Sequence, residues 1–470
     1  MEERDVVVIG GGPAGYVAAI RSSQLGAKVT LVEEDKLGGV CLNCGCIPTK
    51  FLLHSVDLYQ SIRTAEQYGI GVAEVNLDLS KLQARKNRII STLVSGIQSL
   101  LAGNNIEVIN GRAKLTSSNQ VEIDSGQGKK QTIQARKIIL ATGSKAAKLP
   151  VPGADSPDIM NYESLLSLNY LPKSLVIIGG GVVGIEMATI LTKLGCKVSI
   201  VEMMSHIVPT QDAELASILD GALKEDGVQI YCGARVDRIE DAKEGKLVIF
   251  SAGEEVKKLK VEVVAVTVGQ KPNIEGLGLN ECGVVVDEGR IQTDERMQTN
   301  VPNIYAAGDV VGGIMLAHVG FAEGKVAAEN AMGRTSIVDY QAVPQCIFTS
   351  PELASVGLTE EEAVAQGYQI RIGRFPFSAN GMAAILGERR GMVKIITEQK
   401  YSRILGVHVI GPWATSLIAE ATLAMKLELT PQEIIATMHA HPTLSEALWE
   451  AALDVTGETI HFSSQHRMMA

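Results

Sequence analysis

Two stretches of the chain repeat one order of apolar strand, glycine turn, helical pattern and second strand. Residues 5–9 form a β-rich apolar run, the turn GGGPAG follows, and YVAAIRSSQLG has the pattern of a helix before a second strand that ends at Glu33. The stretch SLVIIGGGVVGIEMATILTKLGCKVSIVE, at 174–202, repeats this order and ends with a strand over 197–201 and Glu202. Each stretch therefore predicts a dinucleotide-binding unit.

The glycines of these turns have distinct tasks in such a unit. The first allows a tight turn, the second lets a pyrophosphate approach the backbone, and the third lets the helix pack closely on the strand. The helix that follows offers N–H groups and a positive dipole to the phosphates. The glycines in these positions are Gly10, Gly12 and Gly15 in the first turn and Gly179, Gly181 and Gly184 in the second.

Two dinucleotides on one chain suggest a flavin and a nicotinamide cofactor that exchange hydride. Glu33 and Glu202 stand where a carboxylate accepts hydrogen bonds from ribose hydroxyls. A carboxylate at Glu202 repels a 2′-phosphate, and the next residues, MMSH, include no arginine to bind one. The second site is therefore predicted to favour NAD over NADP.

Two shorter signals fit a flavin site. The run ARKIILATGS predicts a strand that ends in small residues at 141–144, and NIYAAGDV predicts one that ends at Gly308 and Asp309. A carboxylate at the end of a strand can hold a polyol chain such as ribitol. A helix is predicted to start near Met315, and its N-terminus would stabilise an anionic reduced flavin ring.

Composition and charge exclude several classes of function. The 470 residues are enough for about three domains. The net charge is −10 and no basic stripe is evident, so nucleic acid is a poor candidate partner. No apolar run is long enough for a membrane span, and the N-terminal residues have no signal-peptide pattern. We therefore expect a cytoplasmic protein without a membrane partner.

The segment GGVCLNCGCIPTK holds three of the seven cysteines. A zinc or iron–sulfur site needs about four ligands, and the other cysteines are isolated, so no metal is expected. Structural disulfides are rare in the cytoplasm, which leaves a redox pair. On a regular helix Cys41 and Cys46 would lie ~7.5 Å apart, beyond the ~4.4–6.8 Å of a disulfide, so this pair needs a distorted turn, which Gly45 allows. Cys41 with Cys44 is the alternative pair.

The segment HAHPTLSEALWEAA offers a base. His439 and His441 precede a helical pattern, and Glu446 lies five residues after His441. A neutral histidine can accept a thiol proton near neutral pH, and a carboxylate can fix its tautomer and stabilise the imidazolium.

Taken together, these motifs resemble the dihydrolipoamide dehydrogenase family of flavoprotein disulfide oxidoreductases. The resemblance rests on GGGPAGYVAAIRSSQLGAKVTLVE, LGGVCLNCGCIPTK, GGGVVGIEMA, NVPNIYAAGDVVGGIMLAH and HAHPTLSEALWEAAL, which span nearly the whole chain in the order of that family. It implies an α/β fold with two Rossmann-like dinucleotide-binding domains and a C-terminal α+β dimerisation domain. The implied limits are 1–145 for FAD, completed by a central domain at 271–342, then 146–270 for NAD and 343–470 for dimerisation.

The resemblance also assigns roles to residues. It implies a Cys41–Cys46 redox disulfide, with Cys46 against the flavin and Cys41 toward the substrate. It implies Lys50 near the flavin and paired with Glu186, and His441, steadied by Glu446, as the base that reaches the disulfide of the other subunit. The residues implied to hold FAD are Gly10, Gly12, Gly15, Glu33, Lys50, Thr142, Gly143, Ser144, Asp309, Met315, Leu316, Ala317 and His318. Those implied to hold NAD are Gly179, Gly181, Gly184, Glu202 and Gly269.

The implied activity is oxidation of a protein-bound dihydrolipoyl group with reduction of NAD, in a homodimer. The implied partner is the lipoylated carrier protein of a 2-oxo-acid dehydrogenase complex or of a glycine cleavage system. The alternatives are a reductase of another disulfide or of mercuric ion, and a binding protein that keeps only the fold. The chain departs from the family at Cys44, where an apolar residue is usual, at Phe51, where a small residue is common, and at Gln270, where an arginine is common.

Overall fold

The structure is a computed structural model, which describes residues 2–126 and 128–462 of the 470-residue chain. The chain forms two compact units. The first comprises Met1–Lys148, Asn161–Tyr170 and Val268–Val338, and the second comprises Leu149–Met160, Leu171–Thr267 and Asp339–Ala470. The fold is α/β, as predicted. The finer division into four sequence domains remains a prediction.

The first unit is built around a seven-stranded sheet in the order β3-β2-β1-β6-β5-β4, with β18 paired to β6. Its elements are β1 (Glu2–Ile9), α1 (Pro13–Gln24), β2 (Val29–Glu33), α2 (Gly39–Cys44), α3 (Cys46–Arg63), η1 (Ala65–Tyr68), α4 (Leu79–Gly103), β3 (Glu107–Asn110), β4 (Arg112–Ser117), β5 (Gln120–Asp124), β6 (Lys130–Leu140), β7 (Ser144–Ala146), α5 (Tyr162–Leu166), β15 (Gln270–Pro272), β16 (Val286–Asp287), β17 (Arg290–Ile291), β18 (Ile304–Ala306), η2 (Asp309–Val311) and α8 (Ala317–Ala331).

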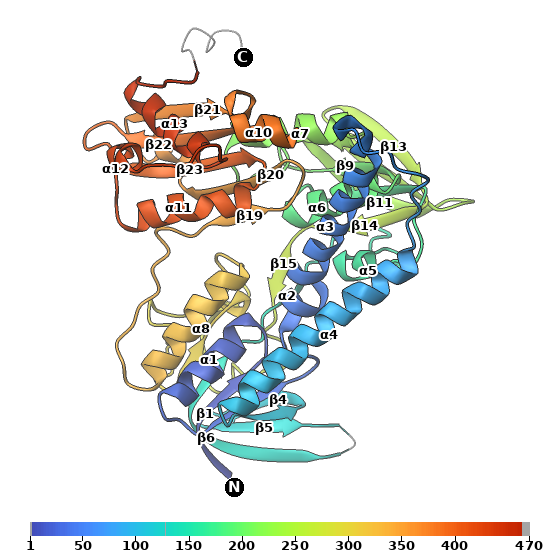
Figure 1. Ribbon diagram of the computed structural model, residues 1–470. Helices are drawn as coiled ribbons and strands as arrows, with labels where there is room; N and C mark the ends of the chain where they lie inside the picture. The colour runs from blue at the N-terminus through green and yellow to red at the C-terminus, as the bar shows by residue number, and fades with distance from the viewer. Residues whose placement is uncertain (1, 127, 463–470) are drawn as a thin grey trace. The chain divides into compact units, whose positions relative to one another are not determined.

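The two faces of strand β1 explain why its sequence is a continuous apolar run. Val6 and Val8 pack with residues of α1 and α8, whereas Val7 and Ile9 pack in a second cluster on the other face. Strands β1, β2, β3, β6 and β18 pair in parallel, so their carboxyl ends meet at one edge of the sheet. Figure 1 shows α1 and α8 side by side over this sheet. Nucleotide sites of doubly wound sheets lie at such an edge.

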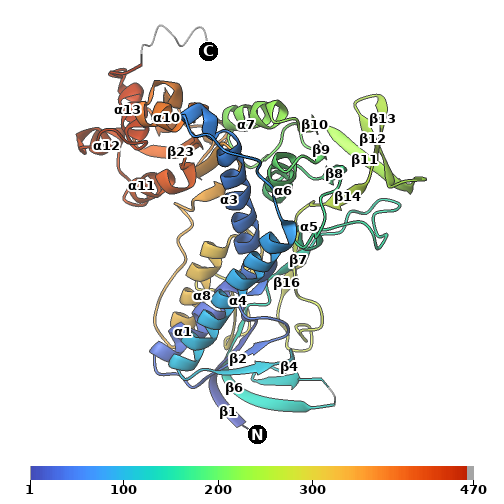
Figure 2. The same ribbon diagram turned by 45° about the vertical axis from the view of Figure 1, so that its right-hand side comes forward.

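The second unit contains three sheets. A parallel sheet has the order β10-β9-β8-β14, a three-stranded antiparallel sheet consists of β11, β12 and β13, and a five-stranded antiparallel sheet has the order β19-β20-β23-β22-β21. Figure 2 shows β11–β13 adjoining β14. The elements are β8 (Ser174–Ile178), α6 (Val182–Lys193), β9 (Lys197–Val201), α7 (Ala213–Glu225), β10 (Gln229–Tyr231), β11 (Ala234–Asp241), β12 (Lys246–Ala252), β13 (Glu255–Val261), β14 (Val263–Val266), β19 (Gln345–Ile347), β20 (Glu352–Gly357), α9 (Glu360–Ala365), β21 (Ile370–Pro376), η3 (Phe377–Ala379), α10 (Gly381–Leu386), β22 (Met392–Glu398), β23 (Ile404–Gly411), α11 (Ala414–Lys426), α12 (Pro431–Ala436) and α13 (Glu446–Thr456).

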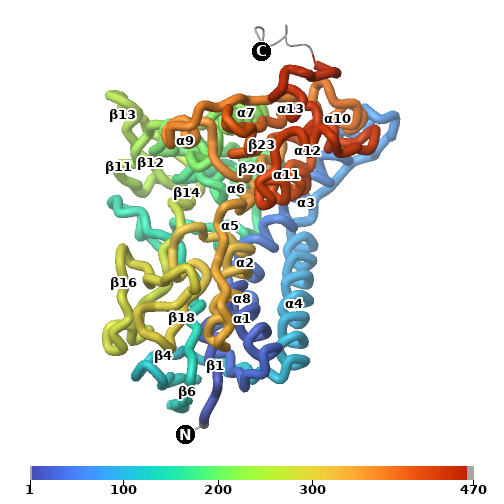
Figure 3. Tube along the Cα trace, turned by 90° about the vertical axis from the view of Figure 1, so that its left-hand side faces the viewer, coloured from blue at the N-terminus to red at the C-terminus, as the bar shows by residue number. Residues whose placement is uncertain are grey.

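Strands β22 and β23 are buried along their whole length because helices cover the five-stranded sheet. Helices α11 and α13 contact these strands, and α7 also packs on β23. Figure 3 shows α11, α12 and α13 gathered beside β23. The loop between α12 and α13 carries the histidines singled out in the sequence, so packed helices hold both of its ends.

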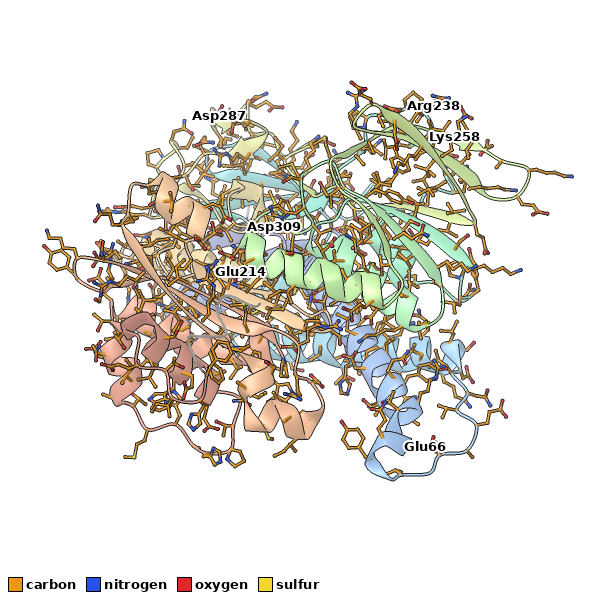
Figure 4. The ribbon with its side chains drawn as sticks, turned by 90° about the horizontal axis from the view of Figure 1, so that it is seen from above. Glu66, Glu214, Arg238, Lys258, Asp287 and Asp309 are labelled. Atoms are coloured by element: carbon orange, nitrogen blue, oxygen red, sulfur yellow. The ribbon has the colours of Figure 1, made fainter. Side chains whose placement is uncertain are left out.

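A buried charge cluster joins the parallel-sheet part of the second unit to its five-stranded sheet. The Lys394 ammonium lies 2.9 Å from both carboxylate oxygens of Asp212 and 2.7 Å from Glu360 Oε2. Arg374 donates to both carboxylate oxygens of Glu214, which Figure 4 labels near the start of α7. Lys394 is 2% exposed and Asp212 is fully buried, so removal of Lys394 would leave the Asp212 carboxylate buried without its ion-pair partner.

Candidate active site

The first glycine turn has the geometry that the sequence predicts for a phosphate cradle. Gly10 has a φ of +106°, and a Cβ at Gly15 would lie 1.8 Å from the Gly10 carbonyl oxygen, so neither position accepts another residue. A Cβ at Gly12 would meet nothing nearer than 3.8 Å. Gly12 caps α1 with no side chain over the helix N-terminus, so the first N–H groups of α1 can take a phosphate.

Glu33 ties this turn to the end of β2. Its Oε2 accepts from the Gly11 N–H at 2.5 Å, and its Oε1 accepts from the Asp35 N–H at 2.8 Å. Burial raises the pKa of Glu33, and these backbone N–H groups oppose the rise. The Glu33 carboxylate therefore stabilises the glycine turn and is also predicted to contact ribose. The sequence alone did not indicate this structural role.

The second glycine turn is built in the same way. Gly179 has a φ of +111°, a Cβ at Gly184 would lie 2.1 Å from the Gly179 carbonyl oxygen, and a Cβ at Gly181 would meet nothing within 4 Å. Glu202 accepts from the N–H groups of Gly180 at 2.5 Å and Met204 at 2.7 Å. The chain thus has two glycine turns of the same build, one in each unit.

A half-buried carboxylate follows β18, where the sequence predicts a contact for a polyol chain. Asp309 begins the short helix η2, and the Ser144 hydroxyl donates to its Oδ2 at 2.6 Å. Burial raises the pKa of Asp309, and the Ser144 hydrogen bond opposes that rise. Figure 4 labels Asp309. Glu323, which the sequence analysis missed, accepts from the Gly308 N–H at 2.6 Å and fixes the turn that precedes Asp309.

Other residues predicted to hold FAD lie around this turn. The Thr142 hydroxyl donates to the Asn273 carbonyl at 2.7 Å, and Gly143 has a φ of +69°. Helix α8 begins at Ala317, two residues after the predicted start at Met315, because Leu316 has extended backbone angles. Met315 and Leu316 therefore precede the helix, whereas Ala317 and His318 lie in its first turn.

The cysteine segment is interrupted where the sequence analysis expected a distorted turn. Helix α2 ends at Cys44, Gly45 has φ −130° and ψ −108°, and α3 starts at Cys46. The hydrogen bond with Cys46 and then burial raise the pKa of Cys41, and the charge of Lys50 opposes this rise. The structure thus brings Cys41, Cys46 and Lys50 together.

Cys44 lies in different surroundings. Burial, followed by the charge of Glu163 and a hydrogen bond to it, raises the pKa of Cys44 to about 12. Glu163 belongs to α5, so no local sequence pattern could have revealed this contact. The structure therefore favours Cys41–Cys46 over the alternative pair Cys41–Cys44.

The histidine loop forms a second group of candidate residues. His441 Nδ1 lies 2.8 Å from Glu446 Oε1, and the Thr443 N–H donates to Glu446 Oε2 at 2.8 Å. Because Nδ1 faces a carboxylate, it carries a proton, which leaves Nε2 of the neutral ring as the proton acceptor. The His441 side chain is 78% exposed, so a substrate can reach it.

Glu186, which is predicted to pair with Lys50, has a backbone partner. The Phe348 N–H donates to Oε1 of the buried Glu186 at 2.9 Å, and the Lys50–Glu186 pair remains a prediction.

Over 2–126 and 128–462, no group of three or more His, Cys, Asp or Glu side chains is placed to hold a metal ion. No helix in these ranges is long and apolar enough to cross a membrane.

Comparisons with known proteins agree with this geometry. The family model "Pyridine nucleotide-disulphide oxidoreductase" matches residues 4–324, and the model of its dimerisation domain matches 343–452. A dihydrolipoyl dehydrogenase of Bacillus subtilis is 42% identical, with 98% of this chain and 99% of the relative covered. The mitochondrial dihydrolipoyl dehydrogenase of Pisum sativum is 40% identical, with 98% and 93% covered.

Solved structures show the same fold. The crystal structure of LpdA from Mycobacterium tuberculosis has a TM-score of 0.89 at 29% identity, with 96% of this chain and 99% of that chain covered. The flavoprotein disulfide reductase RclA from Escherichia coli has a TM-score of 0.84 at 29% identity, with 94% and 98% covered.

Two glycine turns of the dinucleotide-binding pattern and the neighbouring Cys41 and Cys46 are the features of a flavoprotein disulfide oxidoreductase. The chain belongs to the pyridine nucleotide-disulphide oxidoreductase family and, within it, to the dihydrolipoyl dehydrogenases. It is an NAD-dependent oxidoreductase that acts on a sulfur group and uses FAD and NAD(H). The open positions at Gly12 and Gly181 and the half-buried Asp309 fit these two nucleotides. The dimerisation domain supports a homodimer.

Proposed function

We propose that this enzyme oxidises the dihydrolipoyl group of a lipoylated carrier protein to its cyclic disulfide and reduces NAD to NADH. The observation that carries the proposal is the contact of Cys41 with Cys46 across the break at Gly45, close to Lys50. The names of the relatives supply the dithiol substrate, because they are dihydrolipoyl dehydrogenases. A 2-oxo-acid dehydrogenase complex or a glycine cleavage system would provide the carrier.

The chain's own residues supply the thiol chemistry. His441 Nε2 removes a proton from the incoming dithiol, and Glu446 stabilises the imidazolium through Nδ1. The resulting thiolate attacks Cys41 Sγ, the Cys41–Cys46 bond breaks, and Cys46 leaves as a thiolate. The second substrate thiol displaces Cys41, which leaves as a thiol with the proton that the substrate gives up, and the cyclic disulfide product closes. Bound FAD supplies the electron relay from the cysteine pair to NAD.

The glycine cradles would hold the two nucleotides at their pyrophosphates. In the first unit, the N-terminus of α1 would take the FAD phosphates, and Asp309, oriented by Ser144, would accept from the ribitol chain. In the second unit, the N-terminus of α6 would take the NAD phosphates. The carboxylate of Glu202 would accept from the adenosine ribose and disfavour NADP.

The base is proposed to act across the dimer. His441 and Glu446 lie within residues 343–452, which match the dimerisation domain of the family. Such a domain places its residues close to a second copy, so His441 would serve the Cys41–Cys46 pair of the partner subunit. The cytoplasm is the proposed location, since a redox pair of this kind operates beside reduced thiols.

The test is anaerobic NADH formation by the FAD-loaded protein. We expect NADH to form from dihydrolipoamide and NAD. With NADP in place of NAD, NADPH should form much more slowly, and with reduced glutathione as the donor no NADH should form. Cys41→Ser should abolish the reaction and keep the bound flavin. Absence of NADH formation from dihydrolipoamide, together with NADH-dependent reduction of glutathione disulfide or mercuric ion, would show that one of the alternative reductases is correct.

A further inference from the structure

The loop that carries His441 contains a second histidine with a carboxylate partner. Residues 437–445 have no regular secondary structure and connect α12 to α13. His439 Nε2 lies 2.9 Å from Glu420 Oε1, and Glu420 belongs to α11. His439 Nδ1 lies 3.0 Å from the Thr437 carbonyl oxygen. Both ring nitrogens of His439 are therefore engaged.

The donor and acceptor roles of the His439 ring show that both of its nitrogens are held by hydrogen bonds. A carbonyl oxygen only accepts, so Nδ1 of His439 donates to Thr437. The hydrogen bond between His439 Nε2 and the Glu420 carboxylate then needs one proton. It forms whether the imidazole or the carboxyl group carries that proton. The His439 side chain is 6% exposed, in contrast to His441 at 78%. His439 is thus shielded from a substrate, and only His441 presents a ring nitrogen to it.

The two histidine–carboxylate pairs hold opposite ends of the loop. His439 attaches its first part to α11 through Glu420. Glu446 attaches its last part to α13, because it accepts from both His441 Nδ1 and the Thr443 N–H. His441 lies between these attachments on an exposed stretch, so its position depends on both.

A buried asparagine adds a third attachment to the end of the loop that Glu446 holds. Asn380 is 4% exposed, its Oδ1 caps α10 by accepting from the Ala383 N–H, and its Nδ2 donates to the Thr443 carbonyl at 3.0 Å. Two side chains, those of Glu446 and Asn380, therefore hold the end of the loop near Thr443. At the other end, the Thr437 hydroxyl donates to the Glu433 carbonyl of α12 at 2.8 Å, and the link to α11 is the His439–Glu420 contact. Loss of this link to α11 should move His441.

We propose that Glu420 and His439 are positioning residues for proton transfer, which hold the His441 loop against α11 so that Nε2 of His441 meets the substrate thiol. The inference rests on the proposed function, because it takes His441 as the base. It predicts that loss of the Glu420–His439 contact slows the thiol half of the reaction and leaves NADH oxidation with an artificial acceptor unchanged, since that reaction needs no proton transfer at His441.

The experiment compares variants of the FAD-loaded dimer. Glu420→Ala should lower kcat with dihydrolipoamide by roughly 10- to 100-fold, the range that follows from a small misplacement of a catalytic group. His439→Leu, which fills similar space without ring nitrogens, should give the same loss. Glu420→Gln should stay within about 3-fold of wild type, because an amide can either donate to Nε2 or accept from it. The KM for NAD and the acceptor activity should not change in any of the three.

The matched control is Glu428→Ala, which removes one carboxylate from an exposed residue just beyond α11. Its contacts are long: 3.8 Å to Arg403 and 3.5 Å to the Gln341 amide, which donates to it. It should match wild type in every assay. The double variant Glu420→Ala with His439→Leu should be no slower than either single variant, because both remove one contact. In a His441→Gln background, Glu420→Ala should add no further loss.

Each outcome has a distinct meaning. Wild-type turnover in both Glu420→Ala and His439→Leu would overturn the inference, and so would a parallel loss of acceptor activity, because that would show a general structural role. Additive losses in the double variant would also overturn it. If the wild-type protein itself produced no NADH from dihydrolipoamide, the proposed function would fail, and that result is separate from any difference between variants.

Discussion

The second glycine turn allows a test that separates nucleotide binding from folding. Gly181 has φ −72° and ψ −178°, which other residues adopt readily, and a Cβ there would meet nothing within 4 Å. Gly184→Ala would place a methyl group 2.1 Å from the Gly179 carbonyl oxygen and 2.9 Å from Thr267 Oγ1. Carbon–oxygen contacts normally lie at ~3.3 Å or more. Gly181→Ala is therefore expected to obstruct only the ligand, and Gly184→Ala to strain the turn itself.

The expected magnitudes follow from these distances. Overpacking of a tight site costs ~1–3 kcal/mol, which for a domain of this size lowers Tm by roughly 2–12 °C. Gly184→Ala should show such a decrease together with weaker NADH binding. Gly181→Ala should keep Tm within about 2 °C. It should weaken NADH binding by roughly 10- to 100-fold, since it blocks a charge-assisted contact worth ~1.5–3 kcal/mol.

The assay is a titration with NADH followed by quenching of flavin fluorescence, alongside thermal melts of the same preparations. The first glycine turn is untouched, so both variants should retain FAD. Wild-type NADH affinity in Gly181→Ala would refute the assignment of this turn to the NAD phosphates. Wild-type Tm in Gly184→Ala would refute the argument from close packing.

Three further predictions concern other parts of the chain. Cys44→Val should keep most dihydrolipoamide turnover while Cys46→Ser abolishes it, in steady-state assays of flavin-loaded protein; the reverse pattern would restore the alternative cysteine pair. Glu202→Gln should raise kcat/KM for NADP relative to NAD by about 10-fold or more, and an unchanged ratio would show that this carboxylate does not select the cofactor. Burial alone would raise the pKa of Asp212, but the His408 and Lys394 charges and hydrogen bonds lower it from 3.8. Its folded-state pKa therefore lies below the unfolded value, so its stabilisation is present above about pH 4 and is lost as the pH falls further. Lys394→Met should lower Tm at pH 7, by an amount that reflects a cost of ~3–5 kcal/mol for an unpaired buried charge. The difference in Tm from wild type should shrink toward pH 3, where Asp212 becomes protonated. A difference in Tm that does not depend on pH would contradict this account.

Local sequence patterns predicted the elements that hold the nucleotides. The strand over 197–201 agrees with β9 residue for residue, and a helix follows each glycine turn as predicted, although α1 begins at Pro13, three residues before the pattern predicted from Tyr16. The reason is that these elements are specified by contiguous apolar runs and by glycines with strict conformational needs. The break at Gly45 was likewise predictable, because two cysteines at this spacing cannot pair along a regular helix.

Contacts between distant segments were beyond the reach of sequence patterns. The partner of Cys44 is Glu163 on α5, and the partner of His439 is Glu420 on α11. Each pair forms only after tertiary packing brings two elements together. The late start of α8 also escaped prediction, because the extended Leu316 precedes the helix without any residue that marks its beginning.

The most direct test of the account mixes two inactive variants, His441→Gln and Cys41→Ser, under conditions in which subunit exchange is proven. Each variant alone should form almost no NADH from dihydrolipoamide. If His441 serves the cysteine pair of the partner subunit, each mixed dimer holds one site with both defects and one intact site. Random exchange should then restore about a quarter of wild-type activity. No recovery after proven exchange would contradict the account, because it would place His441 in the site of its own subunit or outside the reaction.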